Sequence, residues 1–244
     1  MSLAHQPTRE GVMLAFQSLQ EIPLRPTPLL PVTIRQTECW VKAENLQPIG
    51  AFKIRGAWWA LNNIETDRVV AVSSGNHAQG IAWAAQRLGI KATIVMPRDA
   101  PRVKLENTQA LGAEVVLYER PGEDRDEVAA KLIKERGGAL VHAFGDPFVI
   151  EGQGTAGIEI EAQLRGAPSR IITCCGGGGL AAGLALACPD AAIHVVEPVG
   201  WDMVGQAIAH GAIVHAGDEA PKTICDALQP TATKPGYLEL RKDR

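Results

Sequence analysis

The sequence is poor in aromatic residues and in the segments that mark membrane-bound or secreted proteins. Aromatic residues make up 5% of its 244 residues, and no uninterrupted apolar run approaches the length of a membrane span. Its first ten residues, Met1–Glu10, contain no apolar core of the kind that a signal peptide needs. The five cysteines are odd in number and none stands in C-x-x-C spacing, so neither a disulfide framework nor a zinc site is predicted. These absences favour a cytoplasmic location without a membrane partner.

A surplus of basic charge is also missing. The chain carries 24 lysine and arginine residues against 27 acidic ones, a formal net charge of −3. Such a balance does not suit the neutralisation of a nucleic-acid backbone, so no nucleic-acid partner is predicted. Hydrophobic residues make up 46% and charged residues 21%, and the length allows one large domain or two modest ones.

Short β-branched runs alternate with helical patterns along the chain, which is typical of an α/β protein with mostly parallel sheets. Strands are predicted at 39–43, 68–72, 92–96, 114–118, 139–142, 171–174 and 193–196. Helices are predicted near 76–88, 101–111, 123–136, 151–164, 178–187 and 201–210. Several strands are nearly all apolar, so we expect helices to cover both faces of the sheets. Glycine and proline follow many strands, at the edge where open α/β sheets bind ligands.

Four consecutive glycines, Gly176, Gly177, Gly178 and Gly179, directly follow the strand predicted at 171–174. Without side chains, their N–H groups can bend around an anion, and the next helix adds the positive end of its dipole. The spacing also fits a dinucleotide fingerprint, with Glu197 about 20 residues beyond Gly177. A phosphate is therefore predicted here, belonging either to a nucleotide or to another ligand, and packing without any ligand is the third interpretation.

A second polar stretch, Ser73-Ser74-Gly75-Asn76-His77, follows another predicted strand and opens another helix. Hydroxyl and amide groups at a helix start form a nest that can hold a carboxylate or donate to a phenolic oxygen. Capping of the helix by Ser74 or Asn76 is the simpler interpretation. A nicotinamide enzyme has no standard need for a second nest, so this stretch favours a phosphate ligand other than a dinucleotide.

Lys53 lies between Phe52 and Ile54, two residues before Arg55. An apolar setting and a cationic neighbour both disfavour the ammonium form, which makes a lysine nucleophilic. A lysine in a turn is usually a solvated surface residue, so the motif is weak by itself. Together the three segments supply an amine that captures an aldehyde, a phosphate cradle and a polar clamp, which are the parts needed to bind pyridoxal phosphate.

These stretches resemble the signature segments of fold-type II pyridoxal-phosphate enzymes, and most of all the serine/threonine dehydratases and serine racemases. The resemblance runs from about residue 25 to the last residue, in the family's order. Its segments are 50–57 around Lys53, 73–80 and 176–180, with support from 25–29, 96–101 with Lys104, 112–116, 151–155 and 196–198. It implies an α/β fold with two-domain, open twisted parallel sheets of the tryptophan synthase β-like class. Residues 50–150 would form a small domain inserted into a large one made of residues 1–49 and 151–244.

The resemblance also implies a role for each site residue. Lys53 would form the Schiff base with pyridoxal 5′-phosphate and move the α-proton of a bound amino acid. Phe52 would pack beside the cofactor ring, Asn76 would meet its phenolic oxygen, and Gly176, Gly177, Gly178 and Gly179 would bind the phosphate. Ser73, Asn76 and His77 would hold the substrate carboxylate.

The implied reaction is the conversion of L-threonine or L-serine to a 2-oxo acid and ammonia by a dehydratase, an ammonia-lyase of amino-acid metabolism, that works as a homodimer. Ser74 stands where racemising relatives keep a hydroxyl acid/base, whereas many threonine dehydratases carry alanine there. An amino-acid racemase on the same scaffold is therefore an alternative, and a truncated cofactor-binding chain with little catalysis is another.

Two departures from the family's pattern bear on these expectations. Relatives that bind a divalent cation use the glutamate of a Glu-Pro pair and an acidic residue six positions later. Here Glu197 is present but Met203 stands at the sixth position, so Glu197 is only a weak candidate ligand and no metal is predicted. The family also continues with further strands beyond the segment around Leu228. We therefore expect this chain to be a shortened form that is poorly active or inactive by itself, and either its uncovered apolar strands pair with a partner or its larger domain is loose.

Overall fold

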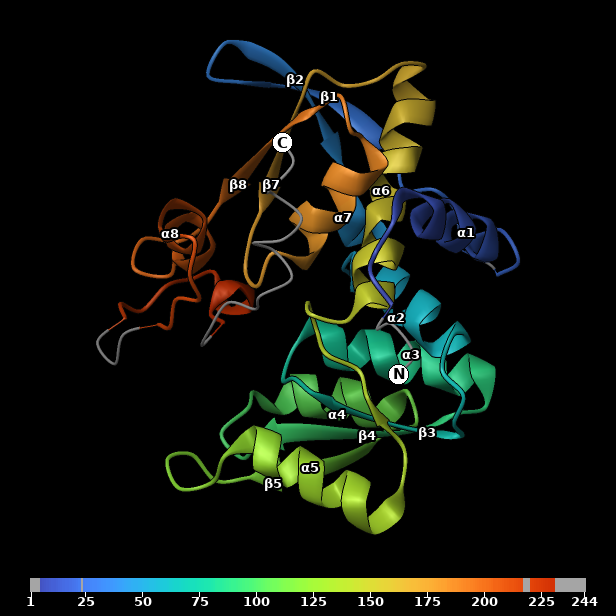
Figure 1. Cartoon of the computed structure of the whole chain (residues 1–244), viewed down its shortest axis with the longest axis vertical. Helices are drawn as coiled ribbons and strands as arrows, with labels where there is room; N and C mark the ends of the chain where they lie inside the picture. The colour runs from blue at the N-terminus through green and yellow to red at the C-terminus, as the bar shows by residue number, and fades with distance from the viewer. Residues whose placement is uncertain (1–4, 23, 217–219, 231–244) are drawn as a thin grey trace.

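The computed structural model describes residues 5–22, 24–216 and 220–230. Helices and strands alternate along this part of the chain, and its strands form three separate sheets (Figure 1). The arrangement is α/β, as the sequence predicts.

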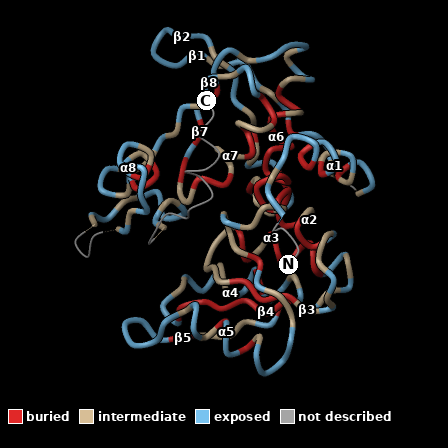
Figure 2. The backbone as a smooth tube through the Cα atoms, viewed as in Figure 1, coloured by how far each residue is buried: buried red, intermediate tan, exposed pale blue. Residues whose placement is uncertain are grey.

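The largest of these sheets has four parallel strands in the order β5-β4-β3-β6. They are β3 (Arg68–Val72), β4 (Lys91–Pro97), β5 (Glu114–Tyr118) and β6 (Ala139–Leu140). Alternate residues of these strands belong to two different cores. Val69 and Ile94 pack in the core that contains α2 (Lys53–Asn62) and α3 (Asn76–Leu88), while Val70 and Val95 pack against α5 (Arg125–Arg136). Both faces of β3 and β4 are therefore buried, and both strands are drawn in the buried colour (Figure 2).

A third core lies beside the long helix α6 (Pro147–Leu164), which packs against α1 (Arg9–Leu19), α2 and α7 (Gly179–Ala187). The contact between α6 and α7 is close because glycines face each other. A Cβ atom on Gly183 would lie 2.4 Å from the carbonyl oxygen of Ile150 and 2.6 Å from the amide nitrogen of Gly154. Any side chain at position 183 would therefore force the two helices apart.

The remaining strands form two small sheets. β1 (Leu29–Ile34) and β2 (Thr37–Lys42) form an antiparallel hairpin, and β7 (Arg170–Cys174) pairs in parallel with β8 (Ala192–Val196), which α8 (Met203–His210) follows. On the β7–β8 sheet, Ile171 is buried, but Ile172 is 68% exposed and Val196 54%. The expectation that helices cover both faces is therefore wrong for this sheet, as far as the described residues go.

Each strand and helix predicted from the sequence is present, with ends that differ by a few residues. The largest change is in α6, which begins at Pro147 because the Asp146 carboxylate accepts a hydrogen bond from the Val149 amide (3.1 Å) and proline suits the first helical position. Helices α1 and α2, strand β1 and the short 3₁₀ helices Glu44–Leu46 and Asp226–Leu228 were not predicted.

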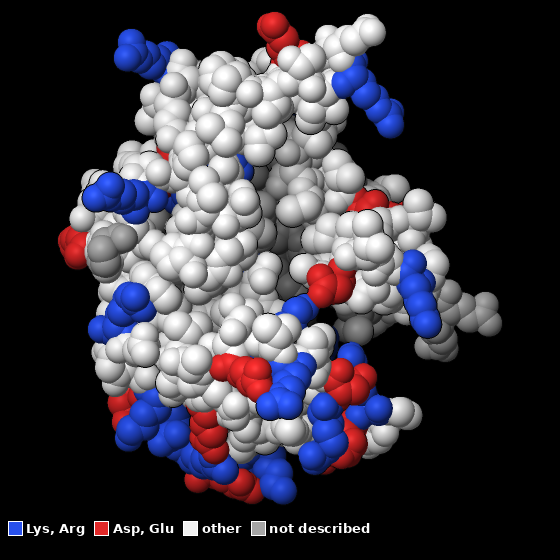
Figure 3. Space-filling model, turned by 180° about the vertical axis from the view of Figure 1, so that it is seen from behind, with Lys and Arg blue, Asp and Glu red and all other residues white. Residues whose placement is uncertain are grey.

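Charged side chains gather at the end of the molecule that carries β5, α4 (Arg102–Ala110) and α5, where both signs alternate (Figure 3). Several of them form exposed ion pairs, such as Arg120–Asp99 and Arg136–Glu114, each at 2.8 Å. None of the helices among the described residues is both long enough and apolar enough to cross a membrane.

Candidate active site

One cavity of about 610 Å³ brings the three predicted segments together. This volume lies within the range of pockets that enclose a small molecule, roughly 300–1,000 Å³. Its walls include every residue predicted to touch cofactor or substrate: Phe52, Lys53, Ser73, Ser74, Asn76, His77, Gly176, Gly177, Gly178 and Gly179. The structure thus places residues from three distant parts of the sequence around one space.

The topology explains why these segments meet. Residues 73–75 follow the carboxyl end of β3 and lead into α3, and residues 175–178 follow the carboxyl end of β7 and lead into α7. Ligands of open α/β sheets bind at such ends. Lys53 is the first residue of α2, a helix that packs against both α3 and α6. Its amine therefore reaches the cavity from a third direction.

The Lys53 amine is held inside the cavity by a backbone carbonyl. Its Nζ donates a hydrogen bond of 2.7 Å to the carbonyl oxygen of Ala143 and lies 5.3 Å from the centre of the Phe52 ring. Burial of the amine lowers the pKa of Lys53 to about 8, and the nearby Cys174 thiol acts weakly in the opposite direction. A larger share of this lysine is therefore neutral near pH 8 than of a lysine in water.

Arg55 does not contribute to that lowered pKa, so this part of the sequence interpretation is wrong. Its guanidinium group is 1% exposed and turns to two carboxylates. It donates to both oxygens of Glu44 (2.8 and 2.8 Å) and to both oxygens of Glu159 (2.7 and 2.8 Å). Lys42 adds a second cation, 2.6 Å from Glu159. This quartet ties the first turn of α2, and with it Lys53, to the segment 44–46 and to α6.

The glycine loop presents a helix start without a capping side chain. Gly178 is the N-cap of α7 in the left-handed conformation (φ 88°), and no side chain accepts from the first amides of the helix. These amides are the unsatisfied donors to which an anion binds. Together with the buried amine and the volume of the cavity, they fit a ligand that carries an aldehyde and a phosphate.

His77 enters the site as a neutral ring. It is 3% exposed, and its Nε2 donates to the carbonyl oxygen of Val141 at 3.0 Å, since a carbonyl can only accept. Burial lowers the pKa of His77 to about 3, and the charge of Lys53 adds to that effect. The ring therefore stays uncharged near neutral pH and offers no cation to a carboxylate.

Several cavity residues were not singled out from the sequence. Phe144, Cys174 and Asp226 line the cavity, and Asp226 forms an ion pair with Lys104 of α4, which the resemblance had already named. A signal for Phe144 exists, because it follows the short strand β6 at the same sheet edge as the 73–77 loop. Asp226 carries no such signal, since its partner is 122 residues away.

Glu197 lies outside the cavity and caps a helix. Its carboxylate accepts hydrogen bonds from the amides of Val204 and Gly205, both at 2.9 Å, at the start of α8. Burial raises the pKa of Glu197, and the two hydrogen bonds lower it by less. In the described part of the chain, no group of three or more histidine, cysteine or acidic residues is arranged to hold a metal.

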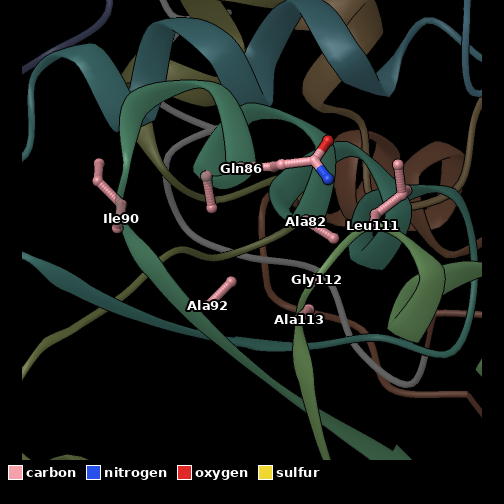
Figure 4. Close-up of a pocket in the computed structure, with 8 residues that line it drawn as sticks. Ala82, Gln86, Ile90, Ala92, Leu111, Gly112 and Ala113 are labelled. Atoms are coloured by element: carbon pink, nitrogen blue, oxygen red, sulfur yellow. The ribbon is translucent and has the colours of Figure 1, made fainter.

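A second recess, of about 90 Å³, lies between α3, the start of β4 and the turn after α4 (Figure 4). Its walls are mostly small or apolar: Ala82, Ala85, Gln86, Ile90, Ala92, Leu111, Gly112 and Ala113. It is much smaller than the main cavity and contains none of the predicted site residues.

The fold and the cavity define a class of α/β protein in which a buried lysine amine and a glycine loop without a capping side chain line one ligand-sized cavity. Residues 21–242 match the family described as pyridoxal-phosphate dependent enzyme, and the chain belongs to that family. Pyridoxal 5′-phosphate, predicted from the three sequence segments, is the cofactor of this family.

Characterised relatives have related activities. The chain is 37% identical over 234 residues to a serine racemase of Schizosaccharomyces pombe, and this match covers 91% of this chain and 72% of that protein. It is 42% identical over 200 residues to an L-threo-3-hydroxyaspartate ammonia-lyase of Pseudomonas sp, covering 79% of this chain and 62% of that protein. The crystal structure of a threonine deaminase from T.th. superposes with a TM-score of 0.87 at 38% identity, covering 98% of this chain and 80% of that one. These likenesses confirm the predicted fold-type II class, and the chain is shorter than each of these relatives.

Proposed function

We propose that the chain is a pyridoxal-phosphate-dependent ammonia-lyase that converts L-threonine or L-serine to a 2-oxo acid and ammonia. The observation that carries the proposal is the Lys53 amine, which opens into one cavity with the glycine loop and the 73–77 loop. The similarity to an ammonia-lyase and to a threonine deaminase supports this reaction.

Lys53 is proposed to attach the cofactor and then, once released, to move the α-proton of the bound amino acid. Its lowered pKa of about 8 suits both tasks, because a neutral amine is the form that attacks an aldehyde and accepts a proton. The Ala143 carbonyl is placed to hold the amine when it carries the proton. When bound, the cofactor supplies the electron sink that stabilises negative charge at the α-carbon.

The other cavity residues are proposed to bind and orient. The glycines 176–179 hold the phosphate, Phe52 lies beside the cofactor ring, and Asn76 meets the phenolic oxygen. Ser73, Asn76 and His77 hold the substrate carboxylate. The His77 ring is neutral and donates to the Val141 carbonyl, so we assign the backbone N–H of His77 to the contact with the substrate carboxylate.

A racemase is the second candidate, favoured by Ser74 and by the similarity to a serine racemase. Ser74 lies on the 73–77 loop and on the cavity wall. A hydroxyl there would serve as a second acid/base that returns a proton to the face opposite Lys53.

Ser74→Ala is expected to suppress racemisation at least tenfold more than elimination, because a second proton donor is needed only for racemisation. The measurement is the rate of D-serine formation and the rate of pyruvate formation from L-serine, in the same samples. Ser73→Ala is the matched control: it removes the neighbouring hydroxyl, assigned to the carboxylate, and should weaken both reactions alike. Equal losses of both activities in Ser74→Ala would show that Ser74 is structural or positions the carboxylate.

The proposed function is tested by a visible spectrum of the purified protein with added pyridoxal phosphate, before and after borohydride, followed by assays with L-threonine and L-serine. We expect an absorbance band that borohydride removes, and 2-oxo acid with equivalent ammonia. D-amino acid in excess of 2-oxo acid would favour the racemase instead. A band without turnover would favour a cofactor-binding chain, and no band would refute a pyridoxal-phosphate enzyme.

We also propose the domain division, the pairing and the location expected from the sequence. The four-stranded sheet is built wholly from residues 68–140, which supports a small domain at 50–150 inserted between 1–49 and 151–244.

The exposed Ile172 and Val196 support a homodimer, because apolar sheet surface is stabilised by a partner. A single monomeric species in sedimentation velocity would argue against the homodimer, and cell fractionation tests the cytoplasmic location.

A further inference from the structure

Residues 141–145 link β6 to α6, and residues 141–144 line the cavity. We call this segment the strap. At one end the Val141 amide donates to the Val70 carbonyl (3.0 Å) beside β6, and at the other Asp146 caps α6. Between these anchors, the Val141 carbonyl accepts from His77 and the Ala143 carbonyl accepts from Lys53. The amine of Lys53 is thus held by a short segment that is itself anchored at both ends.

Phe144 connects the strap to the glycine loop. A Cβ atom on Gly177 would lie 2.2 Å from Cγ of Phe144, and one on Gly179 would lie 3.0 Å from its Cα. The ring also meets the His142 ring edge-on, with the centroids 4.5 Å apart. The missing side chain at position 177 therefore makes room for an aromatic ring as well as for an anion.

Two titratable groups interact with the Lys53 amine. They are His77 at the start of α3, which His142 of the strap also faces, and Cys174 at the end of β7. Neither is a carboxylate that would stabilise an ammonium ion. The state of the amine therefore depends mainly on how well the cavity wall excludes water from it.

We propose that Phe144 is a positioning residue for Lys53: with its ring against Gly177 and its backbone against Gly179, it holds the Ala143 carbonyl at the Lys53 amine and shields that amine from water. The inference rests on the proposed function only in taking Lys53 as the reacting amine. Movement of the ring away from the glycine loop would carry the neighbouring carbonyl with it and open the amine to solvent.

The test titrates the Lys53 amine in the full chain without cofactor. The rate of its acetylation by limiting acetic anhydride is measured against pH by mass spectrometry of the Lys53 peptide, with the exposed Lys91 as internal reference. For the unaltered chain we expect a midpoint near the pKa of about 8. Phe144→Ala should raise the midpoint by about 1 unit, because a hydrated amine returns toward the pKa of lysine in water. Phe144→Tyr keeps an aromatic ring of nearly the same shape and should restore the low midpoint.

Two further variants separate positioning from general loosening. Gly177→Ala keeps Phe144 but displaces its ring, so the midpoint should rise here as well. Phe148→Ala removes a nearby aromatic that stacks on His5 (4.3 Å) outside the cavity, and the midpoint should not move. Should Phe144→Ala fail to fold, Gly177→Ala and Phe144→Tyr decide the question.

A wild-type midpoint in folded Phe144→Ala would overturn the proposal. If Phe144→Ala does not fold, a wild-type midpoint in Gly177→Ala would do the same. The proposal would also fail if the midpoint rose as much in Phe148→Ala as in the Phe144 or Gly177 variant. The titration needs neither cofactor nor turnover. A negative result therefore leaves the ammonia-lyase proposal intact, and an inactive enzyme leaves this test valid.

Discussion

Replacement of Lys53 by alanine is expected to abolish covalent attachment of pyridoxal phosphate and to lower elimination from L-threonine or L-serine by roughly 10²–10⁴-fold or more. The amine lies in the same cavity as the glycine loop, and burial has already lowered its pKa to about 8. Alanine removes both the group that attaches the cofactor and the proposed proton carrier. The measurements are the visible absorbance of the cofactor-loaded protein, the mass of the borohydride-reduced peptide and the rate of 2-oxo acid formation.

Lys91→Ala is the matched control for this variant. Lys91 is an exposed lysine whose amine lies 3.4 Å from Asp67, remote from the residues that line the cavity. Its loss should leave the absorbance and the rate unchanged. A visible band that persists in Lys53→Ala, with the reduced label on a different lysine, would show that the attachment site has been misassigned.

The strands and the ligand-binding loops could be predicted from the sequence because their signals are local. β3 and β5 were placed at their observed bounds, since each is a short apolar run that glycine, proline or polar residues bring to an end. The 73–77 and 176–179 loops follow such strands directly, and the carboxyl ends of parallel strands are where ligands bind. The glycine loop and the polar nest can therefore be predicted from local sequence, without any contact between them.

Helix α2 was missed because its stability comes from distant partners. Its sequence, KIRGAWWALN, carries a glycine and two charges within its first turn, so its local pattern is poor. In the fold, Gly56 fits against α6: a Cβ atom there would lie 2.7 Å from the Val149 carbonyl oxygen, and Ile54 and Ala57 are fully buried. Packing between residues almost 100 positions apart leaves no local signal.

The misreading of Arg55 has the same origin. In a turn, a cation two residues away could have lain beside the Lys53 amine. In a helix, side chains at positions i and i+2 point to different faces. Lys53 therefore enters the cavity while Arg55 turns to Glu44 and Glu159, a contact that the sequence could not reveal without α2.

Arg55→Met is expected to lower the free energy of unfolding by about 3–5 kcal/mol, the usual cost of removing one partner from a buried ion pair. The guanidinium group donates four hydrogen bonds to the carboxylates of Glu44 and Glu159 and one to the Thr155 hydroxyl (3.2 Å), and the variant loses them all. Urea unfolding followed by circular dichroism measures the change. Arg136→Met, which breaks the exposed pair with Glu114, is the matched control and should cost no more than about 1 kcal/mol.

The loss in free energy of unfolding caused by Arg55→Met should also become smaller as the pH falls. Burial alone would raise the pKa of Glu44, but the hydrogen bonds from Arg55 outweigh it and hold that pKa below its usual value. In the wild type, this carboxylate therefore stabilises the fold above its unfolded pKa and stops doing so as the pH falls through its folded pKa. Without Arg55, burial remains and the folded pKa rises above the unfolded one, so protonation stabilises the variant as the pH falls toward about 4.5. Urea unfolding of both proteins at pH 7.5 and at pH 5 tests this prediction: the difference in free energy of unfolding should be smaller at pH 5. An equal difference at both pH values would mean that the lost stability came from packing of the arginine side chain and not from unpaired carboxylates.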